Sequence, residues 1–486
     1  MSAVRTSCYI GGNFVRGDSE PIVVSNPATD AVLAAVPGVG PALAANAAAA
    51  NVAAAVRMRA LPVLKRVELV RRLAAALRQD GARLSALLTA ESGKPIVESR
   101  GEVEYAASFF ENSAAAAETA SGELPASRTA DRRILVLMEP VGATVAITPW
   151  NFPLAMIARK LAPALASGCS QLVKPAEETP LTALAFAELF QRAAQDTGAP
   201  VDAFGVVVGD PELIARAMLA QPGTRKLTFT GSTEVGRILA SACAPRLIRT
   251  ALELGGNAPF IVFADADLDR AVEQAMLAKF RFMGQTCICP NRFLLERGIA
   301  EEFLERLAVR MRAIPVGDPT LESTRMGPLI NDSAVAKVET HVADARARGA
   351  TVRLGGSRVS IPGLSGRFYE PTIVVGCSPS MRCACEETFG PLVAAFEFGT
   401  EQEALALANG VAHGLAAYVM TQDADRLLRV TEALDFGVVG ANDGAPSTAE
   451  APFGGRKDSG SGKEGGVHGL DAYTELKYVS LRLRGC

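Results

Sequence analysis

The chain has 486 residues, of which 49% are hydrophobic and 21% are charged, and its formal net charge is −3. A chain of this length is expected to form two or three domains of roughly 100–200 residues each. The composition is that of an ordinary globular protein, and no basic face or tail indicates nucleic-acid binding.

The amino-terminal residues MSAVRTSCYIGGNFV become polar too early for a signal peptide. The alanine-rich run at 42–56 contains Asn46 and Asn51 and lacks the bulky apolar residues of a membrane span, so it predicts a small-residue helix. We therefore expect a cytoplasmic protein without a membrane partner. The nine cysteines are an odd number without a secretory context, which indicates mostly reduced thiols.

Strands and helices alternate along the first half of the chain. Residues 66–95 have the apolar spacing of a helix that ends at Gly93 and Pro95, and residues 101–120 predict another helix. From Arg133 onward, short apolar runs such as CSQLVKP and KLTFTG alternate with helical segments. This pattern predicts an α/β fold with a doubly wound parallel sheet, which binds ligands at the carboxyl ends of its strands.

A second alternation begins near Ala258. It predicts a strand in APFIVFADAD, a helix over 267–283, a strand in RFLLERG and a helix in EEFLERLAVRM. Strands in RFYEPTIVVG and PLVAAFEF and helices near 401–410 and 424–434 complete a second α/β domain.

Two glycine-containing segments are candidates for a phosphate-binding loop. The only G-x-G-x-x-G motif is GSGKEG (460–465), but no strand precedes it and too few residues follow it, so we favour a flexible loop. KLTFTGSTEVGR (226–237) is the better candidate, because an apolar strand runs into Gly231 and Ser232 before a helix begins. Free N–H groups at that helix start suit a phosphate, and an ordinary serine cap is the alternative.

The segment GQTCICPNR contains Cys287 and Cys289. Buried thiols or a zinc site shared with Cys383 and Cys385 would explain such a pair, but structural zinc favours C-x(2–4)-C spacing and histidine is scarce, so we predict no metal. A nucleophile is a further interpretation, beside that of a buried structural thiol, since Gly284 and Pro290 flank the segment as in a turn, and since Glu253 in LELGGNAP precedes a Gly-Gly pair that lets two chain segments approach closely. A carboxylate near a thiol acts as a general base.

A series of motifs follows in one order over roughly residues 25–480. They are ITPWNFP (147–153), KPAEETP (174–180), FTGSTEVGR (229–237), LELGGNAP (252–259), FRFMGQTC (280–287), EETFGP (386–391) and APFGGRKDSGSGKEG (451–465). Together they resemble the motifs of the NAD(P)-dependent aldehyde dehydrogenase superfamily, and most closely those of its succinate-semialdehyde dehydrogenase group.

The resemblance implies a division of the chain into domains. A Rossmann-like NAD-binding domain would comprise 1–118 and 141–252, and a catalytic α/β domain would comprise 253–448. Residues 119–140 and 469–486 would form a small β oligomerisation domain in a homodimer or homotetramer, since both segments have the apolar alternation of exposed strands.

The resemblance also implies the chemistry. Cys287 would attack the aldehyde, and hydride transfer from the adduct would leave a thioester. Asn151 and the Cys287 backbone N–H would hold the oxyanion, a contact typically worth about 10²–10³ in rate per donor. Glu253 would activate water, and Glu464 would pass protons outward unless it is a solvated loop charge. The thiol, with an ordinary pKa of about 8.5, would need nearby donors or charge to lower that value.

For the cofactor, the resemblance implies a set of binding residues. They are Thr148, Trp150, Lys174, Glu177, Gly209, Thr230, Gly231, Ser232, Leu254, Glu387 and Phe389. A carboxylate such as Glu177 accepts the ribose 2′-hydroxyl but repels a 2′-phosphate, so we expect NAD to be preferred and leave use of NADP open.

For the substrate, the resemblance places Arg159, Arg281 and Ser447 around a distal carboxylate, which predicts succinate semialdehyde. The alternatives are glutarate semialdehyde, another and even uncharged aldehyde, transfer of the thioester to coenzyme A, and a structural protein without activity. Phe282 replaces the asparagine usual in the family, which leaves the shape of the pocket wall open. Cys289 is expected either to form a reversible disulfide with Cys287 or to be a passive thiol.

Overall fold

Two large sheets organise residues 4–483, the part of the chain that the computed structural model describes. The first has eight strands in the order β2-β1-β8-β7-β6-β9-β10-β20, with β8 to β10 parallel and the outer strands antiparallel. Its strands are β1 (Cys8–Ile10), β2 (Asn13–Val15), β6 (Ala143–Ile147), β7 (Ser170–Lys174), β8 (Phe204–Val206), β9 (Thr224–Thr230), β10 (Arg249–Glu253) and β20 (Gly460–Ser461).

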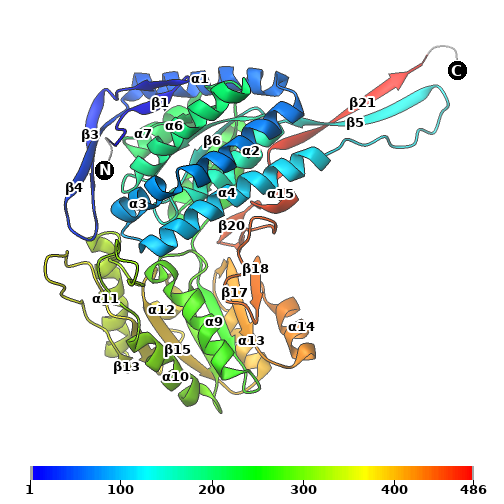
Figure 1. Ribbon diagram of the computed structural model, residues 1–486. Helices are drawn as coiled ribbons and strands as arrows, with labels where there is room; N and C mark the ends of the chain where they lie inside the picture. The colour runs from blue at the N-terminus through cyan, green and yellow to red at the C-terminus, as the bar shows by residue number, and fades with distance from the viewer. Residues whose placement is uncertain (1–3, 484–486) are drawn as a thin grey trace.

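Helices cover both faces of this sheet, as the alternating pattern predicts (Figure 1). α1 and α7 pack together on one face, and α5 and α6 contact the other, with α2, α3 and α4 packed outside them. The helices of this part are α1 (Pro41–Ala60), α2 (Val63–Gln79), α3 (Gly81–Ser92), α4 (Ile96–Thr119), α5 (Ala155–Ser167), α6 (Pro180–Thr197), α7 (Pro211–Ala220), α8 (Thr233–Cys243), the short 3₁₀ helix η1 (Ala244–Arg246) and α15 (Gly466–Asp471). The alanine-rich run is indeed the helix α1, whose small side chains allow close packing on the strands.

The single helix expected over 66–95 is two helices. Asp80, with φ −97° and ψ 12°, leaves helical geometry, so α2 ends at Gln79 and α3 begins at Gly81. Gly93 ends α3 as predicted, in the left-handed conformation with φ 74° that glycine adopts without strain.

The second sheet has seven strands in the order β13-β14-β15-β12-β11-β17-β18, all parallel except β13. Its strands are β11 (Ala258–Val262), β12 (Pro290–Glu296), β13 (Thr351–Leu354), β14 (Thr372–Val375), β15 (Leu392–Phe398), β17 (Ala416–Met420) and β18 (Val438–Ala441). Its helices are α9 (Leu268–Phe280), α10 (Ala300–Arg312), α11 (Asp332–Ala347), α12 (Arg382–Cys385), α13 (Glu401–Asn409) and α14 (Ala424–Ala433).

The strands of the second sheet are apolar on both sides. Phe260 and Val262 of β11 join the cluster under α9 and α10, whereas Ile261 joins the cluster under α13 and α14. Successive residues of a strand point to opposite faces, so a run such as APFIV fills two cores at once.

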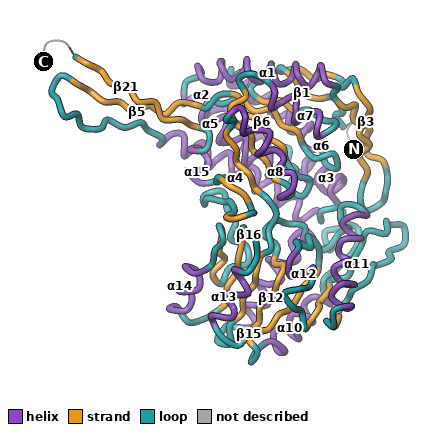
Figure 2. The backbone as a smooth tube through the Cα atoms, turned by 180° about the vertical axis from the view of Figure 1, so that it is seen from behind, coloured by secondary structure: helices purple, strands orange, loops and turns teal. Residues whose placement is uncertain are grey.

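Three small antiparallel pairs complete the fold. They are β3 (Ser19–Ser25) with β4 (Val32–Gly38), β16 (His413–Gly414) with β19 (Arg456–Lys457), and β5 (Arg132–Pro140) with β21 (Thr474–Arg482). The β5–β21 ribbon projects away from the body of the molecule (Figures 1 and 2).

Two further expectations differ from the structure. The helix expected over 267–283 ends at Phe280, and residues 281–284 form a 3₁₀ turn, η2 (Arg281–Gly284), in which Phe282 and Met283 have left-handed backbone angles. The glycine segment GSGKEG is not a free loop, because its first two residues form β20 and extend the first sheet antiparallel to β10. This pairing brings Glu464 behind the end of β10.

No single helix among residues 4–483 combines the length and apolar character of a membrane span. Only α1 and α2 taken together reach it, and the chain bends by 117° between them.

Candidate active site

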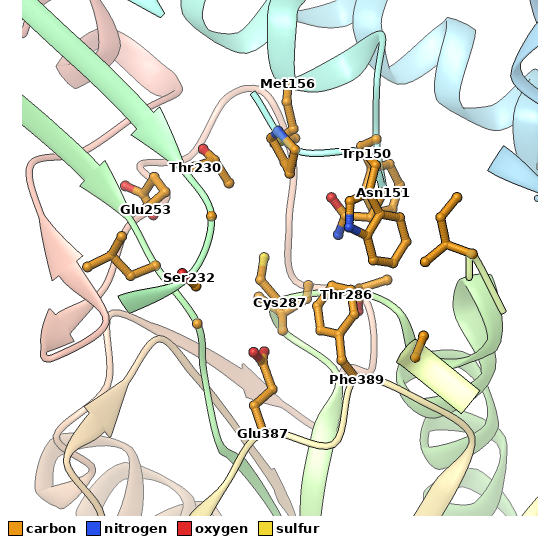
Figure 3. Close-up of a pocket in the computed structure, with 18 of the residues that line it drawn as sticks. Trp150, Asn151, Met156, Thr230, Ser232, Glu253, Thr286, Cys287, Glu387 and Phe389 are labelled. Carbon is orange, nitrogen blue, oxygen red and sulfur yellow. The ribbon is translucent and has the colours of Figure 1, made fainter. Parts of the chain in front are cut away.

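A cavity of about 380 Å³ lies where the carboxyl edge of the first sheet faces the amino edge of the second. Thr230 ends β9 and Ser232 follows it, Glu253 ends β10, and Cys287 precedes β12 (Figure 3). The position follows the rule that open parallel sheets bind ligands at the carboxyl ends of their strands.

Cys287 is on a tight turn, in which the N–H of Cys289 donates to the Thr286 carbonyl at 3.0 Å. Gly256, at the entry to β11, lies against this turn, and a Cβ atom at position 256 would come within 2.6 Å of the Cys287 carbonyl oxygen. The close approach expected of the Gly-Gly pair is therefore present, and it brings Glu253 to the same cavity as Cys287.

Asn151 is buried beside the cysteine turn. Its Nδ2 donates to the carbonyl of Gln285 at 3.0 Å, and Figure 3 shows its amide and the Cys287 sulfur directed into the same space. An amide N–H beside the backbone of Cys287 is the arrangement needed to stabilise an oxyanion formed on an attacked carbonyl.

Two buried carboxyl groups lie side by side at the end of β10. Neither oxygen of Glu253 has a hydrogen-bond partner among the described residues, and burial, reinforced by the charge of Glu464, raises the pKa of Glu253 well above its usual value. Glu464 is buried too, so it is not the solvated loop charge that was its alternative. It accepts from Lys160 Nζ at 2.5 Å and from Thr228 Oγ1 at 3.0 Å.

The pKa of Glu464 is shifted in the opposite direction to that of Glu253. Burial opposes ionisation of Glu464, but the Lys160 and Arg159 charges outweigh it and lower the pKa. Lys160 Nζ also donates to Thr230 Oγ1 at 2.7 Å. Glu253 is thus the more basic of the two carboxylates, and Glu464 stays ionised beside Lys160, an arrangement that gives different roles to two identical side chains.

The thiol itself does not follow the expectation of a lowered pKa. Burial raises the pKa of Cys287 to about 12, and the Glu387 and Glu253 carboxylates add to the rise while Arg159 opposes it. In the protein alone, Cys287 is therefore a thiol, and forming the nucleophilic thiolate requires a base.

Arg159, Arg281 and Ser447 meet on one wall of the cavity, as predicted. Arg159 is buried rather than on a helix surface, and its Nη2 donates to Ser447 Oγ at 3.2 Å and to the hydroxyl of Tyr105. Within residues 4–483, the Arg281 guanidinium has no ion pair or hydrogen bond, so it is not paired with a local acid. Its Cζ atom lies 4.9 Å from the ring centroid of Phe152 and 5.8 Å from that of Tyr105.

Tyr105 is the residue of this cluster that the sequence did not indicate. Its hydroxyl is 2.7 Å from Ser447 Oγ, although α4 and Ser447 are far apart in the chain. No local motif marks it, since it is one of several aromatic residues along a long helix.

The proposed cofactor residues divide into two groups. Trp150, Thr230, Gly231, Ser232, Leu254, Glu387 and Phe389 line the cavity. Thr148, Lys174, Glu177 and Gly209 lie outside that lining, at the ends of β6, β7 and β8 on the same edge of the sheet.

These residues fit a dinucleotide. The side chain of Ser232 caps α8 by accepting from Val235 N at 3.3 Å, which leaves the other N–H groups of the first turn for a phosphate. The buried hydroxyl of Thr148 has no hydrogen-bond partner among the described residues. Lys174 forms an ion pair with the partly exposed Glu177.

Cys289 lies behind the nucleophile rather than in the cavity. Its sulfur is 3.3 Å from Lys279 Nζ, and both Cys287 and Cys289 are free thiols in the structure. The reversible disulfide between them stays a prediction. Among the described residues, no three His, Cys, Asp or Glu side chains gather where they could hold a metal ion.

Residues 14–479 match the family model described as the aldehyde dehydrogenase family. The chain belongs to this family. Mitochondrial succinate-semialdehyde dehydrogenase of Arabidopsis thaliana is 47% identical over 98% of this chain and 89% of that protein. A 3-sulfolactaldehyde dehydrogenase of Pseudomonas putida is 45% identical over 99% and 98%. A glutarate-semialdehyde dehydrogenase of Pseudomonas putida is 44% identical over 98% of each.

Solved structures share the fold of this aldehyde dehydrogenase. The crystal structure of succinate-semialdehyde dehydrogenase from Burkholderia pseudomallei superposes with a TM-score of 0.96 at 46% identity, covering 99% of this chain and 98% of that one. Membership of this family indicates NAD(P)-dependent oxidation of an aldehyde.

We predict that Cys287 of the free enzyme reacts slowly with iodoacetamide at neutral pH. Since only the thiolate reacts, its alkylation rate should rise about tenfold per pH unit from about pH 7 to 10 without a plateau. The rate can be measured by mass spectrometry of the peptide that contains Cys287, with the Cys287→Ala variant as the control for other thiols. A plateau below about pH 9 would contradict the raised pKa.

Proposed function

We propose that the protein oxidises an aldehyde with a distal acidic group to the carboxylic acid, with succinate semialdehyde as the leading substrate and succinate as its product. The proposal rests on the guanidinium of Arg281, which has no ion-pair partner in the described part of the chain and lies beside the cluster of Arg159, Tyr105 and Ser447. These residues line the same cavity as Cys287. Two cationic side chains with apolar surroundings favour a substrate carboxylate over an uncharged chain end.

The first half of the reaction uses three groups of the site. The Cys287 thiol gives its proton to Glu253, its sulfur bonds to the aldehyde carbon, and the carbonyl π electrons move to oxygen. Asn151 Nδ2 and the Cys287 N–H donate to that oxyanion. NAD(P), when bound, supplies the hydride acceptor, and loss of a hydride from the adduct carbon leaves a thioester on Cys287.

The second half consumes one water. Once it has passed the thiol proton on, Glu253 takes a proton from the water, whose oxygen attacks the thioester carbon. Cleavage of the carbon–sulfur bond releases the acid, and the departing sulfur takes the proton from Glu253, which restores the Cys287 thiol. The raised pKa of Glu253 suits a group that must both accept and release protons near neutral pH. Glu464 and Lys160, hydrogen-bonded behind it, provide a route for the proton to leave. Because a water-activating base is present, we favour hydrolysis over transfer to coenzyme A.

The relatives support an acidic substrate but differ in chain length. They are named for succinate semialdehyde, glutarate semialdehyde and 3-sulfolactaldehyde, and each of these aldehydes carries an acidic group. Glutarate semialdehyde is therefore the second candidate substrate, since its carboxylate could reach the same wall.

We predict that kcat/KM for succinate semialdehyde exceeds that for butanal by about 10- to 100-fold, which corresponds to the roughly 1.5–3 kcal/mol of a charge-assisted hydrogen bond. Arg281→Met should remove most of this preference, mainly through KM, and change butanal oxidation by less than about twofold. The rate of NADH production measures the oxidation of both aldehydes by the parent protein and by the variant. Analysis of the product with and without coenzyme A distinguishes hydrolysis of the thioester from its transfer to coenzyme A. Equal efficiency on butanal in the parent protein would exclude an acidic substrate, and no turnover of any aldehyde would exclude the activity.

We propose further that residues 1–118 and 141–252 form the nucleotide-binding domain and that residues 253–448 form the domain that provides the nucleophile. Residues 1–3 lie outside the described part of the chain. We also propose that NAD is preferred to NADP. The Escherichia coli relative is named for NADP(+), a name that does not favour NAD over NADP. The preference rests on Glu177, whose carboxylate neutralises Lys174 and repels a 2′-phosphate.

We predict that Glu177→Ser raises kcat/KM with NADP relative to NAD by about 10-fold, because it frees the Lys174 ammonium for a phosphate. Glu177→Asp retains the charge and serves as the matched control. If the ratio of kcat/KM with NADP to kcat/KM with NAD is the same in the parent and in Glu177→Ser, Glu177 does not determine which cofactor is preferred.

We also propose that the ribbon of 119–140 and 469–486 joins subunits of a homodimer or homotetramer; residues 484–486 lie outside the described part of the chain. Along β21, Leu476, Tyr478 and Leu481 are 68%, 61% and 43% exposed, and an apolar strand at an open sheet edge is a surface that pairs with another chain.

We predict that the double substitution Leu476→Asp and Tyr478→Asp shifts the protein toward a monomer of 50.7 kDa in sedimentation. Leu428→Asp changes an equally exposed leucine of α14, 62% exposed, and should leave the assembly intact. A parent protein that sediments as a monomer would contradict the proposal.

A further inference from the structure

A buried charged cluster lies behind the cavity, outside its lining. It comprises the buried Lys94, between α3 and α4, the buried Glu102 of α4, and Glu98 of α4, which is half-buried. Lys94 is fully buried, its ammonium forms an ion pair with Glu102, and Glu98 and the Arg281 guanidinium are the other charged groups that act on it. An apolar side chain would fill this place without the desolvation cost of two charges, which is several kcal/mol per ion.

The cluster holds the segment that presents Asn151. Lys94 Nζ donates to the backbone carbonyl of Asn151 at 2.9 Å. Glu102 Oε1 accepts from Leu154 N at 3.0 Å and from Ala155 N at 3.2 Å, so it caps the start of α5. One ion pair therefore fixes the segment between β6 and α5 in its middle, at Asn151, and at its end, at Leu154 and Ala155.

The same cluster holds the segment that leads to Cys287. The Lys94 ammonium lies 4.6 Å from the Phe282 ring centroid and 3.8 Å from that of Phe152, and Glu98 accepts from Phe282 N at 2.8 Å. Phe282 and Met283 have φ of 46° and 55°, a conformation that costs roughly 1–2 kcal/mol for each such residue. Contacts from the cluster thus stabilise a strained turn directly before the nucleophile.

Further hydrogen bonds close a ring of contacts. Gln285 N donates to the Phe282 carbonyl at 2.9 Å, and the Gln285 carbonyl accepts from Asn151 Nδ2 at 3.0 Å. The path runs from Lys94 through Asn151 and Gln285 to Phe282 and back to Lys94. The Asn151 amide, one donor of the oxyanion site, belongs to this ring, and Cys287, whose backbone is the other donor, follows Gln285 by two residues.

We propose that Lys94, held by Glu102, is a positioning residue that sets the spacing between the Asn151 amide and the Cys287 turn. The inference rests on the proposed function, since it assigns Lys94 to the oxyanion step of aldehyde oxidation. Lys94 touches neither substrate nor cofactor, and it acts through Asn151 and Phe282. Because the oxyanion exists only after attack by the thiol, loosening this ring should weaken the transition state and leave substrate binding largely unchanged.

The test compares the double variant Lys94→Met/Glu102→Gln with Glu91→Gln. The double variant removes the ion pair, while the glutamine that replaces Glu102 can still cap α5 through its side-chain carbonyl. Glu91 is an equally buried carboxylate that caps α6 by accepting from Leu181 N at 2.8 Å and Thr182 N at 2.9 Å, away from the cavity. Kinetic constants are divided by the fraction of Cys287 that iodoacetamide titrates slowly, as in the folded parent, because the exposed thiol of misfolded protein reacts faster and can be left out of the count.

We expect the double variant to lower kcat and kcat/KM together by about 10- to 100-fold, with KM for the aldehyde and the Kd for NAD each within about threefold. Trp150, the only tryptophan of the chain, lies 6.1 Å from the Phe282 ring and reports on the same place. Its emission should shift in the double variant but not in Glu91→Gln.

Kinetic constants per titrated thiol equal to those of Glu91→Gln would overturn the proposal, even if the thermal midpoint falls. If the double variant does not fold, the same kinetic constants are measured for Phe282→Leu. This variant retains the ion pair and removes only the aromatic ring beside the Lys94 ammonium. A several-fold loss of kcat at constant KM supports the positioning role, and an unchanged kcat overturns it. A parent protein without aldehyde oxidation would refute the proposed function instead.

Discussion

The site depends on the close approach of two chain segments at Gly255 and Gly256. A Cβ atom at position 256 would meet the Cys287 carbonyl at 2.6 Å, and one at position 255 would meet the Glu387 carboxylate at 2.9 Å. Any side chain here would push the second sheet away from the first. Since β10 ends at Glu253 and β11 begins at Ala258, this short connection is also where the chain passes from one sheet to the other. The pair of glycines therefore makes Glu253 and Cys287 neighbours, although they come from different sheets.

Within that constraint, burial controls the protonation of the reacting groups. The raised pKa of Cys287 keeps the sulfur protonated where the aldehyde carbon must enter, the raised pKa of Glu253 makes its carboxylate a stronger base than an exposed one, and the lowered pKa of Glu464 keeps one negative charge beside Lys160. Proton transfer between Cys287 and Glu253 then creates the thiolate only when it is needed. This differs from a permanently ionised thiol, which would be open to alkylation and oxidation throughout the life of the enzyme.

The sequence predicted the parts of the fold that depend on local pattern. The parallel strands are continuous apolar runs, and the helices between them have clear periodicity, so both α/β sheets were foreseen. The break at Asp80 was not, because a helical pattern runs through it. GSGKEG was misjudged because its strand β20 gains its partner from β10, more than two hundred residues earlier in the chain. Pairing of that kind leaves no local signal.

Some residues of the candidate site could likewise be predicted from local sequence motifs, and others could not. Cys287, Glu253 and Asn151 were predicted from motifs, and the structure places them around one cavity. The pKa of Cys287 could not be predicted, because it depends on how much protein surrounds the sulfur rather than on its neighbours in sequence. Tyr105 and Lys94 were missed because each acts through partners that only the tertiary fold supplies.

The two arginines of the substrate wall show why such partners matter. The Arg159 guanidinium is already committed to Ser447 and Tyr105, so it keeps its position whether or not a substrate is present. Among the described residues, Arg281 is held only by ring faces, which orient its plane without using its N–H groups. A carboxylate that enters can therefore take up the free donors of Arg281 without breaking a bond within the protein. In the proposed function, Arg159 would contribute a fixed positive charge and Arg281 the hydrogen bonds, so the reach of Arg281 would set the length of the aldehyde whose carbonyl arrives at Cys287.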